Sequence, residues 1–133
     1  MPARSLNKHP IHLGLGATAE SEPLFTGEMN WFDGYGNRHA ADGAEARLVT
    51  QHTFSSSWSM WEMHPNGAEV VLCTAGQLTL HQELPGGQLK TVVLDPGQYA
   101  INPPGVWHTA DVTGEVAAVF ITAGQGTQHR PRE

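Results

Sequence analysis

The chain has 133 residues, enough for one domain with a sizeable core but too few for two. Its formal net charge is −6 and its few basic residues are scattered, which argues against a nucleic-acid partner. No apolar run is long enough to span a membrane, and the single cysteine, Cys73, excludes an intramolecular disulfide and fits a reducing compartment. We therefore expect a cytoplasmic protein that binds neither nucleic acid nor membrane.

Residues 1–45 are rich in glycine, alanine and polar side chains. Apolar side chains that could anchor this segment occur at Leu24, Phe25, Trp31 and Phe32. We expect a mostly irregular arm with at most one short strand or helical turn. Its aromatic side chains would pack on the remainder of the domain or on a partner subunit.

From residue 46 onward, short apolar segments alternate with turns that contain glycine or proline. The chain has 15 glycines and 9 prolines, a composition that favours many tight turns and hence an all-β fold. Eight strands are predicted, at residues 46–54, 57–64, 69–74, 77–84, 88–94, 98–102, 106–112 and 115–123. Strands of this number and spacing indicate a β-sandwich or a double-sheet jelly roll over residues 46–124. Residues 125–133 are interpreted as a solvated tail.

Four residues are candidates for a metal site. Glu62 and His64 are two positions apart in one predicted strand, so their side chains lie on the same face. Glu69 begins the next strand and can lie near His64 across the hairpin if it also faces inward. His108 comes from a distant strand and shares its face with small apolar residues, which suits an interior position.

Two sequence motifs carry a family resemblance. Residues 62–76, EMHPNGAEVVLCTAG, contain the spacing H-x4-E-x6-G, and residues 97–112, GQYAINPPGVWHTADV, contain G-x5-P-x-G-x2-H. This ordered pair resembles the two motifs of the cupins, and the resemblance covers roughly residues 50–120. It implies an all-β, double-stranded β-helix or jelly-roll barrel, preceded here by the irregular N-terminal arm.

The resemblance also implies the ligands of one divalent metal ion. In the family, two histidines of the first motif, its glutamate and the histidine of the second motif bind the metal, which here gives Glu62, His64, Glu69 and His108. Glu62 stands where the family has its first histidine. Carboxylate and imidazole groups both suit Fe, Mn, Ni or Zn. Two alternatives remain open: Glu62 could act as a base beside the ion, or the four residues could form a polar cluster without metal.

The faces of the predicted strands suggest neighbours for this site. Trp58 and Met60 share the inward face with Glu62, and Cys73 shares that of Glu69, so these three residues are a tentative substrate pocket. They could instead fill the barrel core. The histidines of the terminal segments are expected to be solvated: His9, His12, His39 and His129.

The leading functional hypothesis is a small-molecule metalloenzyme of the oxygenase, isomerase or lyase type, with an unknown substrate. The alternative is a non-catalytic barrel that binds a small ligand with a structural metal or none. We expect a homodimer, because cupins commonly form one and the N-terminal arm offers aromatic side chains.

Overall fold

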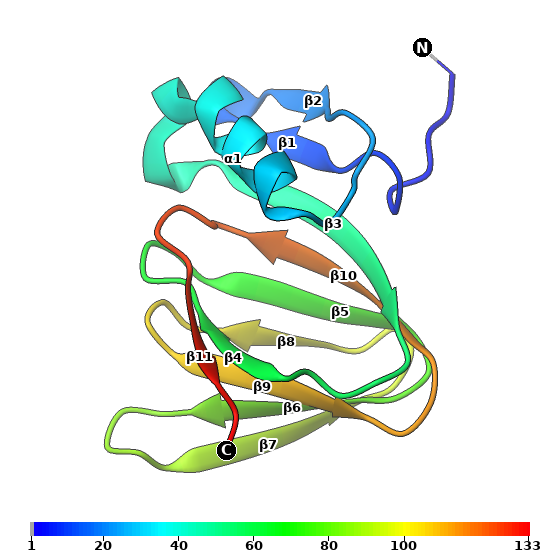
Figure 1. The fold of residues 1–133 in the computed structure, drawn as a ribbon, viewed down its shortest axis with the longest axis vertical. Helices are drawn as coiled ribbons and strands as arrows, with labels where there is room; N and C mark the ends of the chain where they lie inside the picture. The colour runs from blue at the N-terminus through cyan, green and yellow to red at the C-terminus, as the bar shows by residue number, and fades with distance from the viewer. Residues whose placement is uncertain (1) are drawn as a thin grey trace.

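The computed structural model describes residues 2–133 as two antiparallel β-sheets that face each other (Figure 1). The strand order is β2-β1-β3-β10-β5-β8 in the six-stranded sheet and β11-β4-β9-β6-β7 in the five-stranded sheet. The strands are β1 (Ile11–Leu13), β2 (Ala19–Ser21), β3 (Arg47–Phe54), β4 (Met60–Met63), β5 (Glu69–Ala75), β6 (Leu78–Glu83), β7 (Leu89–Leu94), β8 (Tyr99–Asn102), β9 (Trp107–Val112), β10 (Val116–Thr122) and β11 (Gln128–Pro131). One α-helix, α1 (Met29–Arg38), and two 3-10 helices, η1 (Leu15–Ala17) and η2 (Ala40–Glu45), precede β3.

The prediction of an all-β jelly roll is confirmed, and the eight predicted strands correspond to β3 through β10. Most strand bounds differ from the prediction by one residue at either end. The largest difference is at β4, which begins at Met60 instead of residue 57. There the Ser57 hydroxyl accepts a hydrogen bond from the backbone N–H of Val112 at 3.0 Å, so the side chain contacts the backbone of β9 before β4 begins.

The expectation of a mostly irregular N-terminal arm is wrong. Strand β1 pairs with β3 and β2 pairs with β1, so the arm lengthens the six-stranded sheet, and α1 lies beside these strands (Figure 1). Trp31 anchors the helix, since it is 7% exposed and its ring lies 4.9 Å from that of Phe25. Phe25 in turn lies 5.3 Å, ring to ring, from His52 of β3, so the arm packs on the barrel.

The expectation that His12 is solvated is also wrong, because its side chain is fully buried. Its Nδ1 lies 2.7 Å from the Tyr35 hydroxyl and its Nε2 lies 2.6 Å from Oδ2 of Asp42. Its ring stacks on that of His39 with 3.6 Å between ring centroids. These contacts join β1 to α1 and η2.

The last residues are largely exposed, as expected of a solvated tail, but they form a paired strand. Strand β11, drawn in red in Figure 1, pairs with β4 at the edge of the five-stranded sheet. Beyond it, the Arg132 guanidinium donates to the backbone oxygen of Trp58 at 3.0 Å and to the Asp111 carboxylate at 2.8 Å. Short polar strands of this kind are hard to predict, because only a neighbouring strand edge makes them extended.

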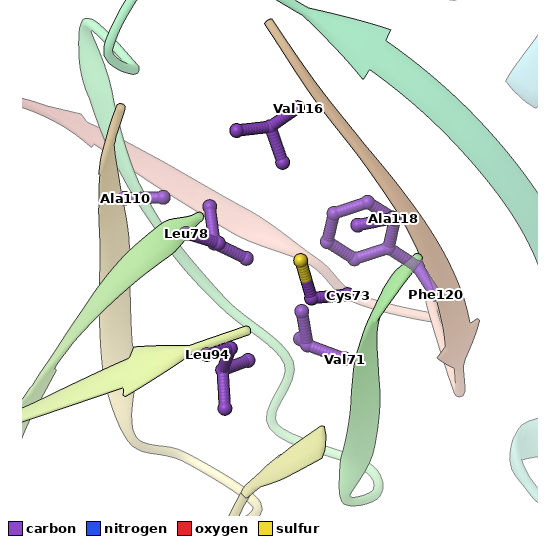
Figure 2. Close-up of a cluster of buried hydrophobic side chains, with 8 residues drawn as sticks. All are labelled: Val71, Cys73, Leu78, Leu94, Ala110, Val116, Ala118 and Phe120. Carbon is purple, nitrogen blue, oxygen red and sulfur yellow. The ribbon is translucent and has the colours of Figure 1, made fainter. Parts of the chain in front are cut away.

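The apolar core lies between the two sheets, and Figure 2 shows eight of its side chains. They are Val71, Cys73, Leu78, Leu94, Ala110, Val116, Ala118 and Phe120. On β5 the inward positions run from Glu69 to Val71 and Cys73, so one strand contributes a site residue at its start and core residues further along. The core therefore fixes the strands that carry the polar cluster.

Replacing the fully buried Leu78 by alanine should lower the free energy of unfolding by about 2–5 kcal/mol, because it leaves a cavity in this core. Leu89, which is 59% exposed on the same hairpin, is the matched control, and its replacement should change stability by roughly 0.5 kcal/mol or less. Urea denaturation of both variants measures the difference. Equal losses would contradict this placement of the core.

Candidate metal centre

In the five-stranded sheet, cross-strand register aligns four polar residues in one row. Glu62 of β4 is paired with His108 of β9, which is paired with Gln82 of β6. On the other side, Glu62 is paired with His129 of β11. Residues paired in this way point to the same face of a sheet, here the interior.

In the six-stranded sheet, a second row faces the first. Glu69 of β5 is paired with Asn102 of β8, whose amide donates to Glu69 Oε1 at 3.1 Å. The Thr122 hydroxyl of β10 donates to Glu69 Oε2 at 2.6 Å. The side-chain amide of Gln82 donates to Asn102 Oδ1 at 2.8 Å and joins the two rows. Both oxygens of the buried Glu69 carboxylate are therefore held in place.

His64 follows β4 and completes the cluster. Its Nε2 lies 2.9 Å from Oε1 of Glu62 and 3.1 Å from Oε2 of Glu69. The Nε2 of His108 lies 3.2 Å from Oε1 of Glu69 and 3.7 Å from Oε1 of Glu62. The structure thus brings together all four residues that the sequence predicts, with one ligand atom from each within 4.8 Å of the others.

The partners at Nδ1 fix which nitrogen of each imidazole carries its proton. Nδ1 of His108 lies 3.3 Å from the backbone oxygen of Val106, which can only accept a hydrogen bond. Nδ1 of His64 lies 2.7 Å from the Thr127 hydroxyl, which donates its own hydrogen to the Gly124 backbone oxygen at 2.8 Å. Both Nδ1 atoms must therefore donate, and the Nε2 lone pairs of the neutral rings face the cluster.

These Nε2 atoms are the unusual feature of the site. Both are buried, and neither has a hydrogen-bond partner of acceptable geometry among the described residues. In neutral imidazoles, the Nε2 lone pairs would face carboxylate oxygens, and two acceptors in contact repel each other. A cation between them, either a proton or a metal ion, removes this repulsion. The donor set of two imidazoles and two carboxylates fits a divalent metal ion.

The charges of the cluster shift the pKa values of its members when no metal is bound. Burial alone would lower the pKa of His64, but the carboxylates of Glu62 and Glu69 outweigh burial and raise it to about 9. The same opposition raises the pKa of His108 to about 9. Burial would raise the pKa of the Glu69 carboxyl, but the two imidazoles lower it to about 2, and they also lower the pKa of Glu62.

Solvent exposure differs among the four side chains of the cluster. The side chains of His64, Glu69 and His108 are at most 4% exposed, whereas that of Glu62 is 26% exposed. Beyond Glu62 in the row, the side chain of His129 is 45% exposed. The exposed part of this row therefore lies next to β11.

His129 is a site residue that the sequence did not reveal. Its side chain is 45% exposed, in line with the expectation that it is solvated, and its Nε2 also lies 2.9 Å from Oε2 of Glu62. It lies outside both cupin motifs, and only the pairing of β11 with β4 brings it to the site.

The residues of the tentative pocket lie at different distances from the cluster. The ring of Trp58 lies 6.4 Å from that of His108 and 6.0 Å from that of Phe120. Cys73 lies in the apolar core, where its thiol donates to the backbone oxygen of Gly76 at 3.5 Å and burial raises its pKa. Met60 lies in β4, two positions before Glu62.

A second group, His12, His39 and Asp42, also brings potential ligand atoms together. The two imidazoles are stacked, with 14° between their planes, so their in-plane lone pairs lie in nearly parallel planes and do not point at one common position between the rings. Both nitrogens of His12 already have hydrogen-bond partners. This group is satisfied without an ion, which leaves the four-residue cluster as the candidate metal centre.

Two facing antiparallel sheets that enclose a histidine and glutamate cluster place the chain in the class of jelly-roll β-barrels. The cupin domain profile matches residues 47–124, and the chain belongs to the cupin family. None of the curated proteins compared with the chain matches it. No helix in residues 2–133 is long and apolar enough to cross a membrane.

Several solved structures share the fold. Peruvianin-I, a cysteine peptidase from Thevetia peruviana latex, is 22% identical with a TM-score of 0.57 over 65% of this chain and 57% of that chain. A recombinant oxalate oxidase in complex with glycolate is 19% identical with a TM-score of 0.55 over 62% of this chain and 45% of that chain. Hydroquinone 1,2-dioxygenase from Sphingomonas sp. TTNP3 is 18% identical with a TM-score of 0.51 over 57% of this chain and 59% of that chain. The chain thus spans about half of the length of these proteins.

Metal binding at pH 7.5 should release about two protons, because the pKa values of His64 and His108 are raised from 6.5 to about 9 and a metal ion requires both rings neutral. Metal affinity should therefore increase as the pH rises toward 9. In the metal-free protein, the protonated His64 and His108 form ion pairs with the two glutamates. The free energy of folding that these pairs contribute is fully present below pH 6.5 and is lost as the pH rises through 9. Calorimetric titration in buffers of different ionisation enthalpy counts the protons. Binding without proton release would contradict the assignment.

Proposed function

We propose that the chain is a metal-dependent cupin that acts on a small molecule, with one divalent ion held by Glu62, His64, Glu69 and His108. The observation that carries this proposal is that two buried Nε2 atoms and two carboxylates lie within 4.8 Å of one another, a donor set that fits one divalent ion. With both rings neutral these groups would place acceptors against each other, and one divalent ion would replace the two protons that remove this repulsion in the metal-free protein.

The residues around the cluster have distinct roles in this proposal. Asn102 and Thr122 hold the two oxygens of Glu69, and Gln82 holds Asn102, so this carboxylate is fixed before an ion binds. A bound divalent ion would supply Lewis acidity or redox chemistry to a small molecule. The ring of Trp58, beside His108, would form an apolar wall for that molecule.

The net charge of the metal and its four ligands affects which substrates the site attracts. Two carboxylates balance a divalent ion, whereas the three imidazoles and one carboxylate implied by the family pattern leave one positive charge. The site should therefore attract anionic substrates less strongly than a three-histidine site. Two of the similar structures are an oxalate oxidase and a dioxygenase, and we take oxygen-dependent oxidation as the first reaction to test, before isomerase or lyase chemistry.

We also propose that the protein is cytoplasmic and forms a homodimer. Its single thiol, Cys73, is free and buried, which suits a reducing compartment. Exposed apolar side chains occur on β8, the edge strand of the six-stranded sheet, where Tyr99 is 63% and Ile101 51% exposed. A partner subunit would cover them.

Elemental analysis of protein purified without a histidine tag tests the metal site. About one equivalent of Fe, Mn, Ni or Zn is expected in the wild-type protein, and a folded double variant, His64→Ala with His108→Ala, should lose it. Less than about a tenth of an equivalent in well-folded wild-type protein would reject the proposal and favour a non-catalytic barrel that binds a small ligand.

Glu62 has a separate test, because it stands at the position where the family has a histidine. We expect Glu62→Gln to weaken metal binding at least about tenfold and Glu62→His to retain it, since a neutral amide oxygen is a poorer ligand than carboxylate or imidazole. Glu115→Gln, at an exposed position in the turn before β10, is the matched control. If the Glu62→Gln variant bound metal as tightly as the wild type, Glu62 would not be a ligand.

A further inference from the structure

The C-terminal segment, residues 125–133, contacts two of the four candidate ligands. It follows the region 47–124 that matches the cupin profile, so the family relationship does not account for it. Its strand β11 is the edge strand beside β4, which carries Glu62 (Figure 1).

The first contact is between Thr127 and His64. The Thr127 hydroxyl donates to the Gly124 backbone oxygen and accepts from Nδ1 of His64 at 2.7 Å. This bond sets the tautomer and the direction of the ring, so that Nε2 points toward Glu69. Without the hydroxyl, the ring would lack the partner that orients it.

The second contact is between His129 and Glu62. His129 Nε2 lies 2.9 Å from Oε2 of Glu62, while Oε1 of the same carboxylate lies 2.9 Å from Nε2 of His64. The two oxygens therefore have different partners, and only Oε1 faces the cluster. The histidine that the family has in place of Glu62 would have no second oxygen atom. The Glu62 carboxylate has a second oxygen, Oε2, and His129 of β11 is its hydrogen-bond partner.

The segment is anchored independently of these two contacts. The Asn66 side-chain amide donates to the Gln125 backbone oxygen at 2.7 Å. The Arg130 guanidinium lies over the rings of Trp61 and Trp107, 5.2 Å and 4.5 Å from their centroids. These contacts hold the segment that carries Thr127 and His129, so the bonds from these two residues can orient the ligand side chains.

We propose that residues 125–133 are a positioning element of the metal centre: Thr127 orients the His64 ring, and His129 holds Oε2 of Glu62 so that Oε1 faces the ion. This rests on the proposed function, since it presupposes a bound ion. Neither residue is a ligand in this scheme. Each acts on a ligand through one hydrogen bond.

The test is a Co²⁺ titration of the full chain, with the affinity taken from competition with a chromophoric chelator and the visible absorption spectrum of the bound Co²⁺ recorded. We expect His129→Leu and Thr127→Val each to weaken Co²⁺ binding about tenfold and to change the spectrum, because a ligand is no longer held. His129→Gln and Thr127→Ser keep a donor or a hydroxyl, and they should recover most of the affinity. His9→Leu is the matched control, because His9 also makes one side-chain hydrogen bond, to the Glu22 backbone oxygen at 3.0 Å, but lies in the N-terminal arm away from residues 125–133.

The outcomes separate this proposal from the proposed function. If the wild-type chain binds no Co²⁺, the proposed function fails. If the wild type binds Co²⁺ but His129→Leu and Thr127→Val match it in affinity and spectrum, only the positioning role is overturned. A loss of affinity in the His9→Leu control equal to that in His129→Leu would also overturn it, because the effect would then be a general loss of stability.

A double-variant comparison makes the test independent of stability. In a Glu62→Ala background, His129→Leu should have no further effect on Co²⁺ affinity, since the group that His129 holds is gone. The same tenfold loss in both backgrounds would overturn the proposal.

Discussion

Two imidazole nitrogens are enclosed between two carboxylates, and the polar interior of this barrel is organised around that contact. The opposite nitrogen of each ring donates to a fixed acceptor, the Val106 backbone oxygen for His108 and the Thr127 hydroxyl for His64. Each ring therefore turns a lone pair toward an oxygen that is itself an acceptor. Such a contact costs free energy unless a cation occupies it. A proton can do so in the metal-free protein, and a divalent ion satisfies four ligands at once.

The fold imposes this contact through strand register. Pairing of β4 with β9 puts Glu62 opposite His108, and pairing of β5 with β8 puts Glu69 opposite Asn102. The same strands continue into the apolar core, so the hydrophobic packing that stabilises the barrel also holds the ligands in place. The hydrogen bond from Gln82 to Asn102 joins the two sheets beside the site.

Much of this arrangement follows from the sequence. The spacing of glycine and proline turns predicts the eight central strands, and the two cupin motifs select the four polar residues that the structure brings together. The identity of the other interior polar residues does not follow, because Asn102 and Thr122 depend on which strands become neighbours in each sheet. Tertiary contacts of this kind leave no local pattern.

The terminal segments were predicted poorly for different physical reasons. Helix α1 contains Gly34 and Gly36 and has no side-chain hydrogen bond at its N-cap, so its local propensity is low. Packing of Trp31 against Phe25 compensates for this. Strand β11 is short and ends at a proline, and it is extended only because the edge of β4 pairs with it. His129, which the structure places against Glu62, could not be recognised until that pairing was known.

The most direct measurement is anomalous diffraction from crystals grown with Co²⁺. The account predicts one strong anomalous peak about 2.0–2.3 Å from Nε2 of His64, Nε2 of His108, a Glu69 oxygen and Oε1 of Glu62. A peak between His12 and Asp42 instead, or no peak in the barrel of a well-ordered crystal, would contradict it.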